Sequence, residues 1–155
     1  MAISHRPLHA SVVEIPRPRP IGDQSVARQL RSVLFSEVLV GAAVVRPKGY
    51  AKVVLAHFLG WAGPFFARRA TEPLPPTLLY LAVTPVDFRL FSKPLFADPF
   101  EIGRWKRGTY RASFDGRRLV LELERLGRVM VIAGSSARPV VDLVVQGAAA
   151  PAAPT

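Results

Sequence analysis

The side chains that could do catalytic chemistry are few in this chain and lie far apart. His5 and His9 lie in a proline-containing N-terminal stretch, whereas His57 lies in an aromatic segment without a visible partner. Ser135-Ser136 follows a glycine, but the GxSxG and SxxK motifs of serine nucleophiles are absent. Because the chain has no cysteine, thiolate nucleophiles, thiolate metal sites and disulfides are excluded. The candidate acids are equally scattered: Asp87, Asp98, Asp115 and Asp142. We therefore expect no enzyme, no metal site and no cofactor.

Positive charge is the more informative chemistry of this sequence. The chain carries 21 lysine and arginine residues against 11 aspartate and glutamate residues, which gives a formal net charge of +10. Such a surface attracts phosphates, nucleic acid or anionic lipid. The absence of asparagine and the abundance of arginine, alanine, valine and proline are also typical of a GC-rich bacterial genome. For the charge alone, we prefer this compositional explanation over a site for polyanions.

Cations and aromatic rings are interleaved on either side of a hairpin signal. Aromatic rings beside cations could anchor a protein at the headgroup layer of a membrane. The alternative is a solvated hairpin face with Trp105 turned inward. Nucleic acid could stack on Trp105 or Tyr110, but we rank it lower because no recognition-helix pattern or zinc-ligand spacing is present. The candidate anion or membrane surface in this run comprises Arg104, Trp105, Lys106, Arg107, Arg111, Arg117 and Arg118.

The N-terminal half predicts two helices around one strand. Asp23 or Ser25 can cap an amphipathic helix whose apolar positions are Val26, Leu30, Val33 and Leu34. Residues 38–45 then predict a strand that a turn at 46–49 ends.

The aromatic stretch at 53–67 predicts an inserted helix near 50–67, which Pro64 should end or kink. A spanning helix needs about 20 apolar residues, and this run is shorter and interrupted, so we do not expect it to cross a membrane. A core position is favoured, and an interfacial position stays open. The small residues share one side of this helix, which makes a candidate helix-packing face of Ala56, Gly60 and Gly63.

The second half of the chain predicts a strand meander followed by a helix. A buried strand at 78–84 and a half-exposed strand at 86–91 flank Pro85, and further strands are expected at 100–107, 109–114, 119–123 and 128–133. Asp115-Gly116 and Leu126-Gly127 supply the turns. The last element is predicted as a helix capped by Ser135 or Ser136, with Pro139 near its first turn and an apolar stripe of Val140, Val141, Val144 and Val145.

The string LYLAVTPVDFRLF, followed by GRWKRGTYRASF, a DG hairpin, a further strand and a terminal helix, resembles the small bacterial pleckstrin-homology-like (PH-like) proteins. The resemblance covers about residues 35–146, apart from Pro85-Val86-Asp87 and the aromatic insertion at 50–69. It implies a bent antiparallel sheet, closed as a partly open roll, with a C-terminal helix at one end. Eukaryotic members often bind phosphoinositides through basic residues between the first two strands. The matching positions here are Arg46, Lys48 and Lys52.

Together these observations predict an α+β, mainly β fold: a PH-like roll with a C-terminal helix and an inserted aromatic helix. We expect one domain at 23–146, a Pro/Arg-rich flexible tail at 1–22 and a disordered Ala/Pro tail at 147–155. The expected function is a non-catalytic binding module, cytoplasmic or peripheral at the inner face of the membrane, whose partner is anionic lipid. The sequence leaves open a protein partner or self-association without lipid binding, and nucleic acid is the least favoured partner.

Overall fold

The computed structural model describes residues 18–56 and 68–150. This part of the chain is mainly an antiparallel eight-stranded sheet with short helices and a C-terminal helix, so the α+β, mainly β prediction is confirmed. The predicted Gly60, Gly63 and Pro64 features and most of both tails lie outside the described residues. In chain order the elements are β1 (Ile21–Gly22), α1 (Gln24–Leu34), β2 (Gly41–Pro47), α2 (Tyr50–Ala56), β3 (Leu78–Val83), β4 (Asp87–Lys93), β5 (Phe100–Lys106), β6 (Arg111–Phe114), β7 (Arg118–Leu123), β8 (Gly127–Ala133), the 3-10 turn η2 (Ser135–Ala137) and α4 (Arg138–Gly147).

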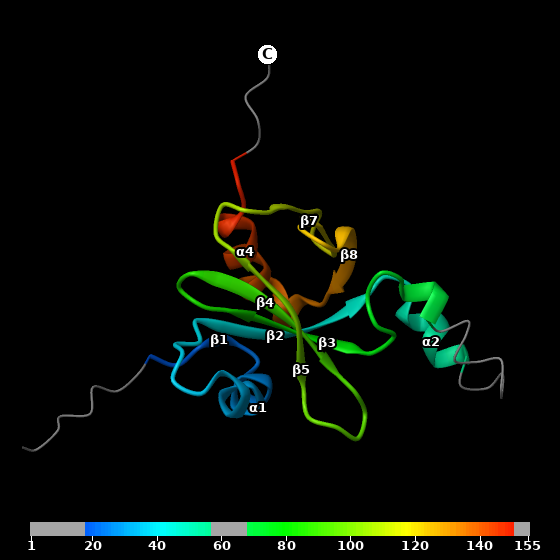
Figure 1. The fold of residues 1–155 in the computed structure, drawn as a ribbon, viewed down its shortest axis with the longest axis horizontal. Helices are drawn as coiled ribbons and strands as arrows, with labels where there is room; N and C mark the ends of the chain where they lie inside the picture. The colour runs from blue at the N-terminus through cyan, green and yellow to red at the C-terminus, as the bar shows by residue number, and fades with distance from the viewer. Residues whose placement is uncertain (1–17, 57–67, 151–155) are drawn as a thin grey trace, which may run out of the picture.

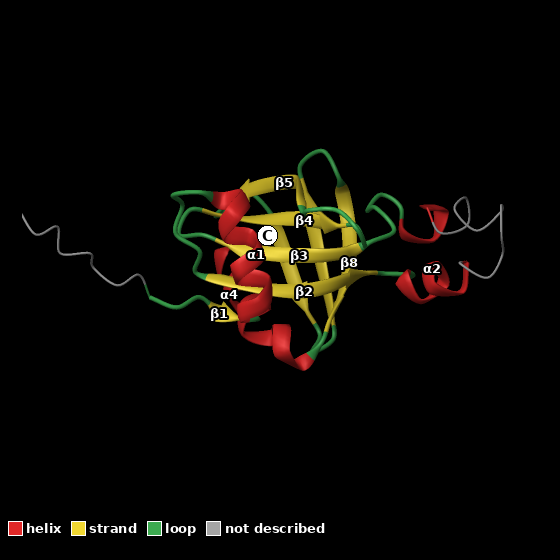
Figure 2. Ribbon diagram, turned by 90° about the horizontal axis from the view of Figure 1, so that it is seen from below, coloured by secondary structure: helices red, strands yellow, loops and turns green. Residues whose placement is uncertain are grey.

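Two antiparallel meanders form the sheet. The first comprises β2 to β5, the second comprises β6 to β8, and they meet where β2 pairs with β8. The strand order is β5-β4-β3-β2-β8-β7-β6, and β1 adds to β2 as a short parallel strand. Figure 2 shows β2, β3 and β4 running side by side, with β8 crossing them steeply. The sheet is therefore strongly bent. Because Ile21 and Gly22 pair with Gly41 and Ala42, the sheet begins before Asp23, earlier than the sequence predicts.

The inner surface of the bent sheet carries the main apolar core, and α4 packs against it. Val140, Val141 and Val144 are fully buried among the inward side chains of both meanders. Figure 1 shows α4 lying beside the sheet, on the opposite side from α1. The predicted helix and its early Pro139 are confirmed. The predicted serine cap is wrong, since Ser135 and Ser136 form η2 and Ala137 precedes α4 without a side-chain cap.

Helix α1 covers the outer surface of the first meander. Asp23 is its N-cap, because its carboxylate accepts hydrogen bonds from the backbone N–H groups of Ser25 and Val26 at 2.8 and 3.2 Å. The buried side of α1 packs against Tyr80 and Phe91 of the sheet. The N-terminal amphipathic helix is thus confirmed, and Asp23 rather than Ser25 caps it.

Strand β4 is buried on both faces, so the prediction of a half-exposed strand at 86–91 is wrong. Its inward residues Phe88 and Leu90 join the main core. Its outward residues Asp87, Arg89 and Phe91 are buried as well. The physical reason is that α1 and the segment after it shield the face that alternation alone would leave in water.

The predicted DG hairpin is present between β6 and β7, but its turn is shifted by one residue. Phe114 pairs with Leu119, which leaves Gly116, with φ 95°, and Arg117 at the centre of the turn. The Asp115 carboxylate accepts hydrogen bonds from the backbone N–H groups of Arg117 and Arg118. These hydrogen bonds, the one from Arg118 most strongly, lower the pKa of Asp115.

The described part of the inserted helix is α2, which has seven residues. Val53 and Ala56 are buried together with Tyr50 beside them, whereas Leu55 is exposed. Ala56, the one described member of the predicted packing face, is buried, with 3% of its surface exposed. Among the described residues, no helix is long and apolar enough to span a bilayer.

Candidate anion-binding face

The outer face of the second meander gathers basic residues from distant parts of the chain on one surface. Strand register places Arg46 of β2 opposite Ile132 of β8, and Ile132 opposite Arg118 of β7. Further along the same face, Arg128 pairs with Glu122, and Glu122 pairs with Arg111 of β6. Alternation explains why these side chains point outward, since the intervening residues of β7 and β8 are buried in the core.

Among the described residues, no helix covers this surface as α1 covers the first meander, and its outward side chains are exposed or half-buried. At the end of β2, the Lys48 backbone N–H donates to the Met130 carbonyl at 3.0 Å, which ties Lys48 to β8. Half-buried Val120, Met130 and Ile132 form the apolar centre of the surface. We call this surface the cationic face and define it by its basic residues Arg46, Lys48, Arg111, Arg118 and Arg128.

Two carboxylates offset the five cations of the cationic face: Glu122 on β7, and Glu72, which lines a hollow together with Lys48 and Arg128. Glu122 lies 3.9 Å from Arg111, and both side chains are more than half exposed, so water screens this pair. The adjoining β7–β8 loop adds Glu124 and Arg125, one charge of each sign. An excess of guanidinium groups on an open surface suits phosphate oxygens, which arginine can bind in a bidentate manner.

Two shallow hollows adjoin Arg128. The first, of about 400 Å³, lies over β6 to β8 beside Arg111, Ser113 and Glu122. The second, of about 230 Å³, lies between Lys48, Arg128 and the segment Ala70–Leu74. Arg128 was not among the predicted site residues, although the alternation of positions 128, 130 and 132 could have placed it on the outward face of its strand.

Trp105 and Tyr110, the two aromatic residues within the basic run, point inward, so they cannot anchor at a headgroup layer. Trp105 is 6% exposed, its indole N–H donates to the Glu124 carbonyl at 3.2 Å, and its ring stacks on Phe88 with centroids 5.2 Å apart. The Tyr110 hydroxyl donates to the Val144 carbonyl near the end of α4. Burial raises the pKa of Tyr110 to about 12, against an opposing effect of the Arg107 charge. The alternative with Trp105 turned inward is therefore correct.

The structure divides the other predicted cations into separate groups. Arg46, Lys48, Arg111 and Arg118 share the cationic face, whereas Lys52 lies on α2 and Arg117 lies in the β6–β7 turn. Another group lies at the end of β5: Arg104 and Lys106 are in the strand, and Arg107 comes directly after it.

Arg104 is neutralised within the fold. Its guanidinium donates to both carboxylate oxygens of Glu101, at 2.7 and 2.9 Å. This hydrogen bonding raises the pKa of Arg104. Arg104 also lies opposite Arg89 of β4, on the face of the first meander that carries α1. It therefore belongs to a different surface from Arg118 and Arg128.

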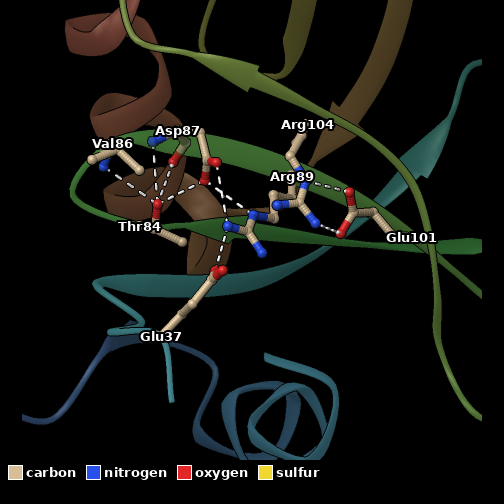
Figure 3. Close-up of polar contacts among 7 residues, drawn as sticks. All are labelled: Glu37, Thr84, Val86, Asp87, Arg89, Glu101 and Arg104. Carbon is tan, nitrogen blue, oxygen red and sulfur yellow. Dashed lines mark hydrogen bonds and ion pairs between the residues drawn. The ribbon is translucent and has the colours of Figure 1, made fainter. Parts of the chain in front are cut away.

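A buried polar network surrounds Arg89, and sequence reasoning missed it (Figure 3). Arg89 is 4% exposed, pairs with Asp87 at 3.1 Å and pairs with Glu37 from the segment after α1. The Thr84 hydroxyl donates to the Asp87 carboxylate at 2.7 Å. The i, i+2 spacing of Asp87 and Arg89 indicates a shared strand face. The contribution of Glu37 depends on tertiary packing and has no local signal.

The described residues contain no cluster of three or more histidine, cysteine, aspartate or glutamate side chains that could hold a metal ion. Comparison with protein-family models, with curated proteins and with solved structures found no match to this chain.

Proposed function

We propose that this chain adopts a PH-like roll. The strongly bent antiparallel sheet and its C-terminal helix support this proposal, because both features are what the resemblance of residues 79–91 and 103–114 implies. The insertion between β2 and β3 remains a departure from that pattern, as does Pro85 between β3 and β4.

We further propose that the protein is a non-catalytic binding module that associates with anionic membrane surfaces through the cationic face. The observation that carries this proposal is the convergence of five cations, against the carboxylates Glu122 and Glu72, on a sheet face that no described helix covers. Anionic lipids give the inner leaflet of the cell membrane its negative surface potential, so we place the protein there as a peripheral component.

The expected affinity of the cationic face is low. Each cation near an anionic membrane contributes about 1 kcal/mol. A net excess of three such charges amounts to roughly 3 kcal/mol, which corresponds to a dissociation constant in the millimolar range. The proposed association is therefore reversible and sensitive to salt.

The cationic face fits lipid better than single-stranded nucleic acid. Proteins that bind single strands without sequence preference stack bases on exposed aromatic rings. Trp105 and Tyr110, the rings within the basic run, are buried instead, and Tyr50, whose ring lies beside Arg46, is half-buried. The centre of the face is aliphatic, with Val120, Met130 and Ile132 half-buried, and such side chains suit shallow contact with a headgroup layer better than base stacking.

The direct test measures co-sedimentation of the full chain with vesicles. We expect binding to phosphatidylserine-containing vesicles and no binding to phosphatidylcholine vesicles. Binding to the anionic vesicles should fall progressively between about 50 and 500 mM salt, because the Debye length shortens over this range. A single-stranded oligonucleotide serves as the competitor. Equal binding to neutral vesicles, or binding to the oligonucleotide with none to anionic vesicles, would reject the lipid proposal.

A further inference from the structure

The loop between β4 and β5 carries at its tip two adjacent apolar side chains that nothing in the described chain covers. Leu95 is 83% exposed and Phe96 is 96% exposed. Figure 1 shows this loop at the foot of the molecule, whereas β7 and β8 lie at its top. The pair therefore lies on a different side from the cationic face. Single exposed apolar residues are common on protein surfaces, but two neighbours at a loop tip form a compact knob.

The fold holds this knob in a defined shape. The Lys93 ammonium group donates to the carbonyls of Pro94 and Ala97, which closes the loop beneath the two side chains. Pro94 and Pro99 fix the backbone at both ends of the loop. A loop that is ordered before binding loses little conformational entropy when it docks, which favours its use as an interaction element.

A groove that could receive the knob begins beside the same loop. It is lined by Pro73, Leu74, Pro75, Pro76, Phe100 and Ile102, with Arg68, Glu72 and Glu101 at its rim, and its volume is about 840 Å³. This volume is within the range of pockets that bury drug-sized ligands, so it has room for one leucine and one phenylalanine side chain. Phe100 is 53% exposed in the groove and lies four residues after Phe96.

The charges around the knob and the groove favour a second copy of this chain over a membrane. Lys93 and Asp98 flank the knob, whereas Arg68 and Glu72 flank the groove, so each region carries one charge of each sign. The remaining rim carboxylate, Glu101, is already paired with Arg104. Two chains with a formal charge of +10 repel one another over most of their surface. The repulsion is much weaker between the knob and the groove, because the charges of each region balance. An anionic bilayer would instead favour an excess of cations around the knob.

We propose that the protein forms a two-fold dimer in which Leu95 and Phe96 of each copy enter the groove of the other. The knob and the groove are neighbours on one chain, which is the arrangement that a reciprocal two-fold contact requires. This proposal goes beyond the membrane association proposed above and does not depend on it.

Because the chain has no native cysteine, single cysteine variants test this geometry directly. We would mix Phe96→Cys protein with a size-tagged Pro76→Cys protein under mild oxidation, and we expect a disulfide-linked heterodimer. Phe35→Cys mixed with Pro76→Cys is the matched control, because Phe35 is also highly exposed (86%) but lies in the turn after α1. Equal cross-linking of the control and the test pair would overturn the proposal.

Sedimentation velocity over a concentration series gives the second measurement. We expect the native chain to dimerise and the Leu95→Ser/Phe96→Ser variant to dimerise about tenfold or more weakly, while Phe35→Ser behaves like the native chain. Circular dichroism checks that each variant is folded. A native chain that stays monomeric and gives no cross-link would overturn the proposal. So would a fluorophore at Phe96→Cys that responds to vesicles but not to protein concentration, since that result indicates bilayer insertion.

Discussion

At the scale of single residues, burial separates two arginines that alternation and charge would treat alike. Arg89 and Arg104 face each other across β4 and β5, and each pairs with a carboxylate. The Arg89 side chain is 5% exposed, whereas the Arg104 side chain is 54% exposed. A buried pair that loses one partner leaves an uncompensated charge in the interior, whereas an exposed pair returns to water.

We therefore expect Arg89→Met to lower the free energy of unfolding by about 3–5 kcal/mol, because Asp87 would remain buried without its partner. The matched variant Arg104→Met should change it by about 1 kcal/mol or less. Urea denaturation of both variants provides the measurement. Similar losses of unfolding free energy for the two substitutions would contradict the expectation that burial makes the Arg89 pair more costly to break than the Arg104 pair.

Tyr110 gives a prediction about pH. Its pKa in the folded protein is about 12, whereas an unfolded chain releases a tyrosine proton near its ordinary pKa of about 10. The stability contributed by neutral Tyr110 is thus complete below pH 10 and is lost as the pH rises towards 12. Tyr110→Phe should be less stable at pH 7 by about 1 kcal/mol, since its hydrogen bond to Val144 is absent.

The difference in stability between the native chain and Tyr110→Phe should then shrink as the pH rises above 10 and reverse its sign at about pH 11, because only the native chain carries this ionisation and one pKa unit corresponds to about 1.4 kcal/mol. Urea denaturation at pH 7, 10 and 11 measures the trend, and the same comparison cancels contributions from the lysines and the other tyrosines. A difference that stays constant with pH would show that Tyr110 ionises normally in the folded state.

At the scale of elements, the N-terminus of α1 depends on one side chain. The Asp23 carboxylate accepts both capping hydrogen bonds, whereas Ser25 contributes only its backbone N–H to this cap. Asp23→Ala should lower the free energy of unfolding by about 1 kcal/mol, and Asp23→Asn should retain most of the stability. Ser25→Ala, measured by the same denaturation experiment, is the control and should be close to neutral. A larger effect of Ser25→Ala than of Asp23→Ala would contradict the capping assignment.

The elements themselves could largely be predicted from the sequence, because their signals are local. Alternation and turn residues predicted β3 and β5–β8 within two residues at each end, and periodicity predicted α1 and α4. The burial of β4 could not be predicted this way, since it depends on α1 packing across the sheet. The inward position of Trp105 did have a local signal, because Arg104 and Lys106 flank it and neighbouring residues of a strand face opposite sides.

The candidate site was only partly predictable for a related reason. Arg46, Arg111 and Arg118 come from three strands, and only the pairing of β2 with β8 brings Arg46 near the other two. A basic run in the sequence therefore grouped residues that the fold separates. Arg104 stands with Glu101 and Arg89 on another face, whereas Arg128, outside the predicted group, joins the cationic face.

At the scale of the whole molecule, the Leu95-Phe96 knob lies on a different side from the cationic face, whereas the groove proposed to receive it shares Glu72, Pro73 and Leu74 with the hollow beside Lys48 and Arg128. The cationic face on β6–β8 carries the proposed membrane contact, and the Leu95-Phe96 knob carries the proposed dimer contact. Removing the knob should leave the cationic face intact. Linking two weak membrane-binding faces in a dimer could raise the avidity well above that of one face, if both can reach the same bilayer.

The most direct test of the central claim compares two charge reversals in the co-sedimentation experiment. Arg118→Glu/Arg128→Glu alters the cationic face, whereas Arg28→Glu/Arg31→Glu alters exposed positions of α1 and lowers the formal net charge equally. We predict that the first pair weakens binding to phosphatidylserine-containing vesicles by at least about tenfold, while the second leaves it within about threefold. An equal loss for both pairs, or no loss for the first, would contradict a membrane contact at the cationic face.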